Sequence, residues 1–257
     1  MNKSQQQTVA FDSNFCLSQT SDRIIFNTKN VIDQSRKYTR IELVSLEMLM
    51  SFPNIRIENR SNLLQLVVNG ISYNITLPTI NYLRIEDLIS DINTRLSAVI
   101  PIAQTITIAL HNPTYLVKFI VNANVTSFSV TDTVLSNNIL GFNTKELGFI
   151  PVAGQQVQVI AARMYNLNHE NYLSMNLVEI GSNQQHINPM VLGAFKLPML
   201  NSFGTTLYYS QSFYSNIIQS NLSYNINTNL SVQFFDRYGY KIDMKNIEFS
   251  FSLSFSD

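Results

Sequence analysis

The residues of this chain that could bind a metal ion are few and scattered. It contains three histidines, His111, His169 and His186, and one cysteine, Cys16. A zinc site needs three or four Cys, His or carboxylate ligands at suitable spacings, and these histidines belong to no HExxH or similar pair. His169 precedes Glu170 directly, but adjacent side chains on a strand point in opposite directions. We therefore predict no metal-binding residues.

The motifs of nucleophilic and phosphate chemistry are also missing from the sequence. There is no GxSxG motif, and Cys16 lies in a polar N-terminal stretch rather than in a site that would activate a thiol. Gly148 and Gly154 are too far apart for a phosphate loop, and no GK[ST] follows them. Asp236 and Asp243 flank a Tyr-Gly-Tyr turn, which we expect them to cap. We predict no catalytic residues, no cofactor and no enzymatic activity.

The composition restricts the class of protein. The 257 residues include 17 basic and 17 acidic side chains, and 13% are charged while 45% are hydrophobic. Disordered chains combine low hydrophobicity with high net charge, and nucleic-acid-binding proteins need clustered Lys and Arg, so both classes are disfavoured. A surface with little net charge favours association between copies. The composition therefore suggests a globular protein that packs against other proteins.

The cysteine count and the hydropathy pattern bear on location. One cysteine cannot form an internal disulfide, the first fifteen residues do not resemble a secretory signal, and no run of about eighteen apolar residues is present. We expect a protein of a reducing compartment without a membrane span.

Alternation with a period of two dominates the sequence and predicts strands. Between Ile247 and Phe255, apolar residues alternate with Glu and Ser, so one strand face is aromatic and the other is lined with serine. Many short strands separated by turn signals indicate a sandwich or barrel. Further strands are predicted at residues 40–50, 55–59, 63–68, 71–77, 105–110, 115–121, 127–130, 156–164, 172–180 and 230–234.

One segment has helical spacing instead. Between Ile85 and Val99 the apolar residues recur every three or four positions, Glu86 and Asp87 lie in the first turn, and Pro101 ends the pattern. We predict a helix over 85–99 that packs on a sheet. The expected organisation is an N-terminal arm at residues 1–22, which carries Gln5-Gln6-Gln7, and one domain at 23–257 with a small helix-containing elaboration at about 78–102.

Three passages together resemble a known family. The first runs from Tyr73-Asn74-Ile75-Thr76-Leu77-Pro78 through Tyr82 to the helix with Leu88-Ile89 and Ile92-Asn93. The second is Ser136-Asn137-Asn138-Ile139-Leu140-Gly141-Phe142, and the third is the hairpin Leu230–Tyr240 with Asp236 and Gly239 before the last strand. They are similar, in order and spacing, to passages of the small capsid proteins of virophages and polinton-like viruses. Thr79-Ile80-Asn81 stands where that family has a glycine after Leu-Pro, so this turn differs in detail.

The resemblance implies a fold and a role. The fold would be an all-β single jelly-roll sandwich, since 257 residues do not hold the two rolls of a major capsid protein. The role would be that of the penton, which forms homopentamers at the fivefold vertices of an icosahedral capsid. The implied partners are copies of itself, hexon-like capsomers of the major capsid protein and, as further candidates, minor capsid proteins. The implied location is the virion capsid, assembled in the host cytoplasm, with neither a nucleic-acid-specific site nor a membrane span.

Three alternatives remain at this point. One is a minor capsid or cement protein beneath the shell. Another is a receptor-binding or carbohydrate-binding sandwich of the fibre-head type, which would use an exposed aromatic cluster in loops, and Tyr208, Tyr209, Phe213 and Tyr214 are its candidates. The third is a glycosidase-like enzyme, for which the sequence offers no carboxylate pair.

Overall fold

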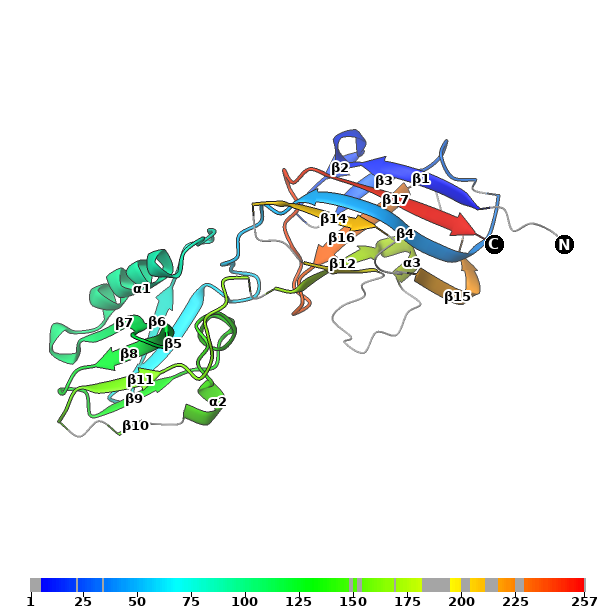
Figure 1. Cartoon of the computed structure of the whole chain (residues 1–257). Coiled ribbons are helices and arrows are strands. Elements are labelled where there is room, and N and C mark those ends of the chain that lie inside the picture. Colours follow the sequence, from blue (N-terminus) through cyan, green and yellow to red (C-terminus); the bar gives the residue numbers. More distant parts are fainter. Residues whose placement is uncertain are drawn as a thin grey trace. The chain divides into compact units, whose positions relative to one another are not determined.

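The computed structural model of this chain contains two compact units (Figure 1). The first combines residues Met1–Phe52 with Glu170–Asp257, and the second is the segment Pro53–His169 between them. The chain therefore leaves the first unit once and returns to complete it. The residues that the structure describes are 6–21, 23–33, 35–147, 150–151, 154–168, 170–181, 195–199, 204–210, 217–224 and 229–256.

The first unit is a sandwich of two antiparallel sheets, which we call sheet A and sheet B. Sheet A has the order β1 (Gln7–Asp12), β17 (Phe249–Ser256), β4 (Tyr38–Leu49), β14 (Thr206–Ser210), and β15 (Ile217–Tyr224) also pairs with β4. Sheet B has the order β13 (Phe195–Pro198), β12 (Tyr172–Leu177), β16 (Asn229–Phe235), β3 (Ile24–Asn27), β2 (Ser18–Gln19). The short helices η1 (Ser13–Phe15) and α3 (Val178–Gly181) follow β1 and β12.

The core of the sandwich is rich in phenylalanine. The rings of Phe11 in β1 and Phe251 in β17 stack with their centroids 4.9 Å apart, and Phe26 of sheet B meets Phe251 edge-on at 5.5 Å. Phe234 of sheet B likewise meets Phe249 at 5.3 Å. Such offset and edge-on pairs contribute beyond the area they bury. The predicted aromatic face of the last strand is confirmed, and it joins the two sheets.

The segment predicted to be an extended N-terminal arm contains a strand of the sandwich. Residues 7–12 form β1, which pairs with β17 near the other end of the chain, from Gln7 with Phe255 to Asp12 with Ser250. The Gln6 side chain donates to Ser254 Oγ at 2.7 Å, and the Gln7 side chain donates to the Val31 carbonyl at 2.6 Å. The polar composition indicated an arm, but Val9 and Phe11 alternate into the core while the glutamines bond at the strand margin. This stretch is an edge strand of the sandwich.

The second unit has its own sheets and its own core. One sheet has the order β10 (Ile150–Pro151), β9 (Ser127–Val130), β5 (Leu63–Val68), β6 (Ile71–Thr76), and the other has the order β11 (Val157–Ile160), β8 (Leu116–Val121), β7 (Ile106–His111). Its helical elements are α1 (Ile85–Val99), η2 (Ile102–Gln104), the π-helix η3 (Val134–Ile139) and α2 (Thr144–Leu147). The expected elaboration at 78–102 is therefore one part of a unit that spans 53–169.

Most of the predicted elements are present. The helix spans the predicted residues 85–99, and strands lie within or across the predicted ranges with one exception. The strand predicted at 55–59 is wrong, because local bonds make turns there: Arg56 N donates to Ser61 Oγ at 2.8 Å, and Ser61 N donates to Asn59 Oδ1 at 3.0 Å. Side chains of this type compete with strand pairing. The all-β jelly-roll sandwich expected from the sequence is confirmed.

Candidate assembly surface

The outer face of sheet A consists largely of small polar side chains. Because β17 alternates Phe or Leu with Ser, its serines face away from the core, and Ser250, Ser252 and Ser256 are half-buried while Ser254 is buried. Ala10 pairs in register with Ser252, Ser252 with Ser45, and Ser45 with Ser210, which makes one row of small residues across four strands. Such a row makes this part of the sheet face flat and uncharged.

The adjacent row on this face carries the charged and aromatic groups. Asp12 pairs with Ser250, Ser250 with Glu47, and Glu47 with Tyr208. Glu47 is exposed, and Tyr208 on β14 is 68% exposed. The row therefore runs from a carboxylate on β1, at one edge of the sheet, to a phenol on β14, at the other edge.

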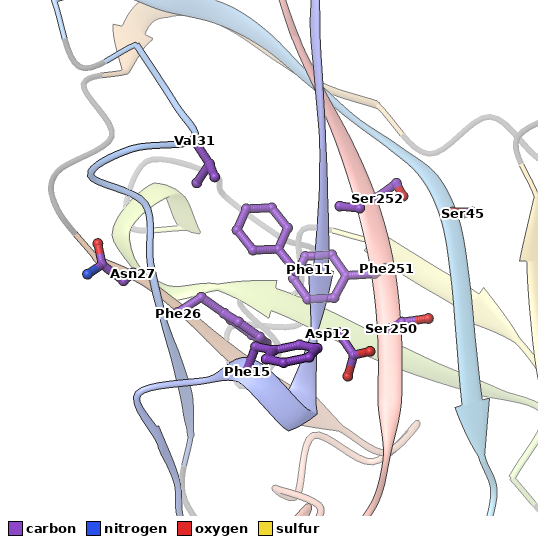
Figure 2. A pocket seen from close by; sticks show the side chains of 11 residues that line it. Phe11, Asp12, Phe15, Phe26, Asn27, Val31, Ser45, Ser250, Phe251 and Ser252 are labelled. Atoms are coloured by element: carbon purple, nitrogen blue, oxygen red, sulfur yellow. The ribbon is translucent and has the colours of Figure 1, made fainter.

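A pocket of about 340 Å³ opens at the β1 edge of sheet A (Figure 2). Its buried apolar wall is formed by phenylalanines of both sheets, and its rim by two side chains that are largely or partly in solvent, Phe15 at 85% and Val31 at 43% exposure. The lining residues are Ala10, Phe11, Asp12, Phe15, Phe26, Asn27, Val31, Ser45, Ser250, Phe251 and Ser252.

The chemistry of this pocket suits binding rather than catalysis. Asp12 is its one ionisable lining residue, and Asp12 Oδ1 accepts a hydrogen bond of 2.8 Å from the Asn14 backbone N–H. Asn27 Oδ1 accepts from the backbone N–H of Lys29 at 2.9 Å. The remaining lining residues are the aromatic and aliphatic side chains together with Ser45, Ser250 and Ser252, so the pocket offers both apolar and hydroxyl groups to whatever covers it.

A second pocket of about 330 Å³ lies on the same face and is acidic. Asp12, Glu47 and Glu248 contribute its carboxylates, next to Leu49 and Thr206. Among the described residues, however, no three His, Cys, Asp or Glu side chains are grouped so that they could bind one metal ion. We therefore assign no metal site to the acidic pocket.

The histidines and the cysteine considered in the sequence are not brought together in the described part of the chain. His111 ends β7, and its Nδ1 lies 2.8 Å from Thr114 Oγ1 in the following turn. Cys16 is half-buried against the core of the sandwich. His169 and His186 lie outside the described residues.

Of the two aspartates predicted to cap the Tyr-Gly-Tyr turn, Asp236 does so, whereas Asp243 caps the turn that follows it. Asp236 Oδ1 accepts hydrogen bonds from the backbone N–H groups of Tyr238 and Tyr240, both at 2.9 Å. Asp243 Oδ1 accepts from Lys245 N at 2.9 Å. Side-chain caps of this kind replace the partners that turn amides lose.

The aromatic cluster considered for carbohydrate binding is not formed by its described members. Tyr208 is exposed, but Tyr209 is buried in the sandwich core, because successive residues of β14 face opposite sides of the sheet. Phe213 and Tyr214 lie outside the described residues. Tyr208 is thus a single exposed aromatic at a sheet edge.

Helix α1 belongs to the first of the three passages that resemble the capsid-protein family, and its Asn93 side chain attaches it to the sheet. Asn93 donates from Nδ2 to the Ile108 carbonyl and accepts at Oδ1 from Ile108 N, both at 2.8 Å. The side chain thereby pairs with β7 as a neighbouring strand would. Tyr82 donates to Asp91 on the same helix, and burial, followed by this carboxylate, raises the pKa of the Tyr82 hydroxyl.

The Leu-Gly-Phe passage closes the core of the second unit. Leu140 and Phe142 are fully buried on either side of Gly141, which has φ of +83°. A Cβ atom at this glycine would lie 2.2 Å from the Arg163 carbonyl oxygen, so only glycine allows the two backbone segments to approach. Arg163 N donates to the Gly141 carbonyl at 3.1 Å.

Comparison with known proteins finds a structural relative. The chain is similar in structure to the penton protein of mavirus, with a TM-score of 0.52 and 8% sequence identity, and the likeness covers 98% of this chain and 99% of that one. No protein-family model matches the sequence, and no curated protein matches it. At this identity the likeness establishes the fold alone, an all-β jelly-roll fold, and it extends over both units of this chain.

The described helices also bear on membrane insertion. In the residues that the structure covers, no helix combines the length and the apolar character needed to cross a bilayer.

Proposed function

We propose that this chain is a structural capsid protein, the penton subunit of an icosahedral virion. The observation that carries the proposal is the likeness to the mavirus penton protein over 98% of one chain and 99% of the other. A jelly roll alone serves many functions. Here the likeness extends over the whole chain, so it takes in the inserted second unit as well as the sandwich.

The surface of the sandwich supports an assembly role. The row formed by Ala10, Ser252, Ser45 and Ser210 on sheet A offers hydroxyls without charges to desolvate. The chain as a whole has no net formal charge to keep copies apart. The pocket at the β1 edge and the exposed Phe15 beside it add apolar area of the kind that interfaces cover.

The proposal specifies partners and location. Five copies form a homopentamer at each fivefold vertex of the capsid. The pentamer is surrounded by hexon-like capsomers of the major capsid protein, and minor capsid proteins are further partners. The protein resides in the virion after assembly in the host cytoplasm, and its role is structural rather than catalytic.

Counting and locating the protein in purified particles tests the proposal. Five copies at each of the vertices correspond to about sixty per particle, which quantitative mass spectrometry against the major capsid protein measures. Electron microscopy of particles with a labelled chain should show density at the vertices. Density beneath the shell or a different copy number would identify a cement protein, and binding to a glycan array would favour a receptor-binding sandwich.

A further inference from the structure

The turn between β5 and β6 in the second unit contains the only Asn-Gly pair in the sequence, Asn69-Gly70 (Figure 1). We propose that Asn69 is a deamidation site whose reaction the fold holds back, so that Asn69 is converted only when this turn opens. The reaction takes place in the second unit alone and does not depend on the penton proposal.

Deamidation of an Asn-Gly pair needs no enzyme and no reagent other than water. The Gly70 backbone nitrogen attacks Asn69 Cγ, and the new C–N bond closes a succinimide ring. The side-chain amide nitrogen leaves as ammonia, which carries away the Gly70 amide proton. Water then opens the ring at either carbonyl and gives aspartate or isoaspartate. Glycine favours the attack because it has no side chain beside the attacking nitrogen.

The backbone of the turn keeps the two reacting atoms apart. Val68 pairs directly with Ile71, so Asn69 and Gly70 form a two-residue hairpin loop, and both have positive φ, +50° and +78°. This is the pattern of a type I′ turn. In the left-handed region ψ is about +50°, which places the Gly70 nitrogen opposite Asn69 Cβ across the Cα–C bond. Ring closure needs the two atoms on the same side, so the turn must open first.

Hydrogen bonds to the segment that enters β9 hold the Asn69 side chain as well. Asn69 Oδ1 accepts from Thr126 N at 2.7 Å, from Thr126 Oγ1 at 2.9 Å and from Ser127 N at 3.2 Å. The Asn69 backbone N–H donates to the Ser127 carbonyl at 3.0 Å. Ring closure moves Asn69 Cγ toward Gly70 and so takes Oδ1 away from these three donors.

The two products have different effects on the second unit. Aspartate keeps the backbone unchanged, and its carboxylate can accept the same three hydrogen bonds. Isoaspartate adds a methylene group to the backbone of a two-residue turn, and the length of this turn sets the register of β5 against β6. That register buries Leu64, Leu66 and Val68 of β5. Formation of isoaspartate therefore loosens the pairing of β5 with β6.

The rate of deamidation follows the opening of the turn. A reaction that needs local opening proceeds at the rate of the open chain multiplied by the population of the opened state. Gly70 is exposed and Asn69 is half-buried, so water reaches the site without opening of the whole unit. The native chain should therefore react slowly, and the unfolded chain should react at the full rate of an Asn-Gly pair.

Incubation of the full chain at mildly alkaline pH tests this directly. Peptide mass spectrometry measures the deamidated fraction at Asn69 over time, in buffer and in concentrated urea. We expect the folded chain to react at least about tenfold more slowly than the unfolded chain. Gly70→Ala is the control for the chemistry, because nothing lies within 4 Å of an added Cβ while the methyl group hinders the attacking nitrogen. It should strongly slow the reaction in urea.

A substitution at Thr126 measures the contribution of the side-chain donors. Thr126→Val keeps the shape of the side chain and removes one of the three donors. It should speed deamidation of the folded chain by about fivefold, the factor that corresponds to one hydrogen bond, and leave the rate in urea unchanged. Thr105→Val is the matched control, because Thr105 is also exposed and its hydroxyl donates to the Ile102 carbonyl at 2.6 Å rather than to Asn69. It should leave both rates unchanged.

Each result either supports or overturns the assignment of Asn69. Equal rates in buffer and in urea would overturn the protection by the fold, and no reaction in urea would overturn the site itself. Equal effects of Thr126→Val and Thr105→Val would refute the role of the Thr126 donor. Labelling with an isoaspartyl methyltransferase identifies the isoaspartate product, in which hydrogen exchange of β5 and β6 should be faster than in the unreacted chain and in Asn69→Asp. Equal exchange in all three would contradict the loosened pairing.

Discussion

Replacing Gly141 by alanine tests how the second unit holds its core closed. Gly141 has φ of +83°, and an added Cβ would lie 2.2 Å from the Arg163 carbonyl oxygen, whereas ordinary contact begins at 3.4 Å. The two segments must therefore separate by about 1 Å. That movement weakens the bonds from Arg163 N to the Gly141 carbonyl and from Asn166 N to the Ile139 carbonyl, now 3.1 and 2.7 Å.

The expected cost follows from two contributions. A left-handed backbone costs an alanine about 1 kcal/mol, and each of the two weakened hydrogen bonds contributes about 1 kcal/mol. We expect Gly141→Ala to destabilise the second unit by about 3 kcal/mol. Gly154 is a matched control in the same unit, because its φ is +67° but nothing lies within 4 Å of an added Cβ. Gly154→Ala should cost about 1 kcal/mol.

Urea unfolding followed by hydrogen exchange and mass spectrometry measures both variants. Since the chain has two compact units, peptides from residues 53–169 should be scored separately from the rest. We expect Gly141→Ala to lower protection in the second unit about 2 kcal/mol more than Gly154→Ala does, with the sandwich unaffected. If both variants lose the same stability within about 0.5 kcal/mol, the backbone approach at Arg163 does not hold the core closed, and the reasoning is refuted.

Two further predictions concern helix attachment and the N-terminal strand. Asn93→Ala removes both hydrogen bonds to Ile108, so exchange protection of α1 and β7 should fall by about 2 kcal/mol, and unchanged protection would contradict the attachment. Phe11→Ala, which removes the ring stacked on Phe251, should cost the isolated monomer about 3 kcal/mol in urea unfolding. Phe15→Ala should cost the monomer less than about 0.5 kcal/mol because Phe15 is exposed, and similar losses for both would mean that residues 7–12 add nothing to the sandwich.

The elements that could be predicted from the sequence are those with a long local pattern. Helix α1 has buried Ile85, Leu88, Ile89, Ile92 and Leu96 at helical spacing. The strand β17 alternates phenylalanine or leucine with serine over its whole length. In both cases the periodicity of the backbone and the burial of one face repeat within a few residues, so neither depends on knowing a distant partner.

The N-terminal strand could not be predicted in the same way. It has only Val9 and Phe11 as inward residues, and the partner that orders it lies at the other end of the sequence. The extent of the inserted unit was missed for a related reason. The strands before and after it complete the same sandwich, and a periodic pattern does not say which strands share a sheet.

The candidate surface could not be predicted from the sequence, because its residues come from several separate segments. The pocket combines residues from β1, the turn after it, β3, β4 and β17. Tyr208 was noted as one of four aromatic residues of a loop cluster, but it belongs to an edge strand whose next residue, Tyr209, faces the core. Alternation within 206–210 was the available signal, and it indicates a single exposed aromatic rather than a cluster.

The mass of the purified protein under native conditions tests the central claim most directly. With a chain of 29.3 kDa, the penton assignment predicts a closed assembly of five subunits, about 147 kDa, that dissociates to monomers without intermediate rings of other sizes. A stable monomer at all accessible concentrations, or a closed assembly with another number of subunits, would contradict it.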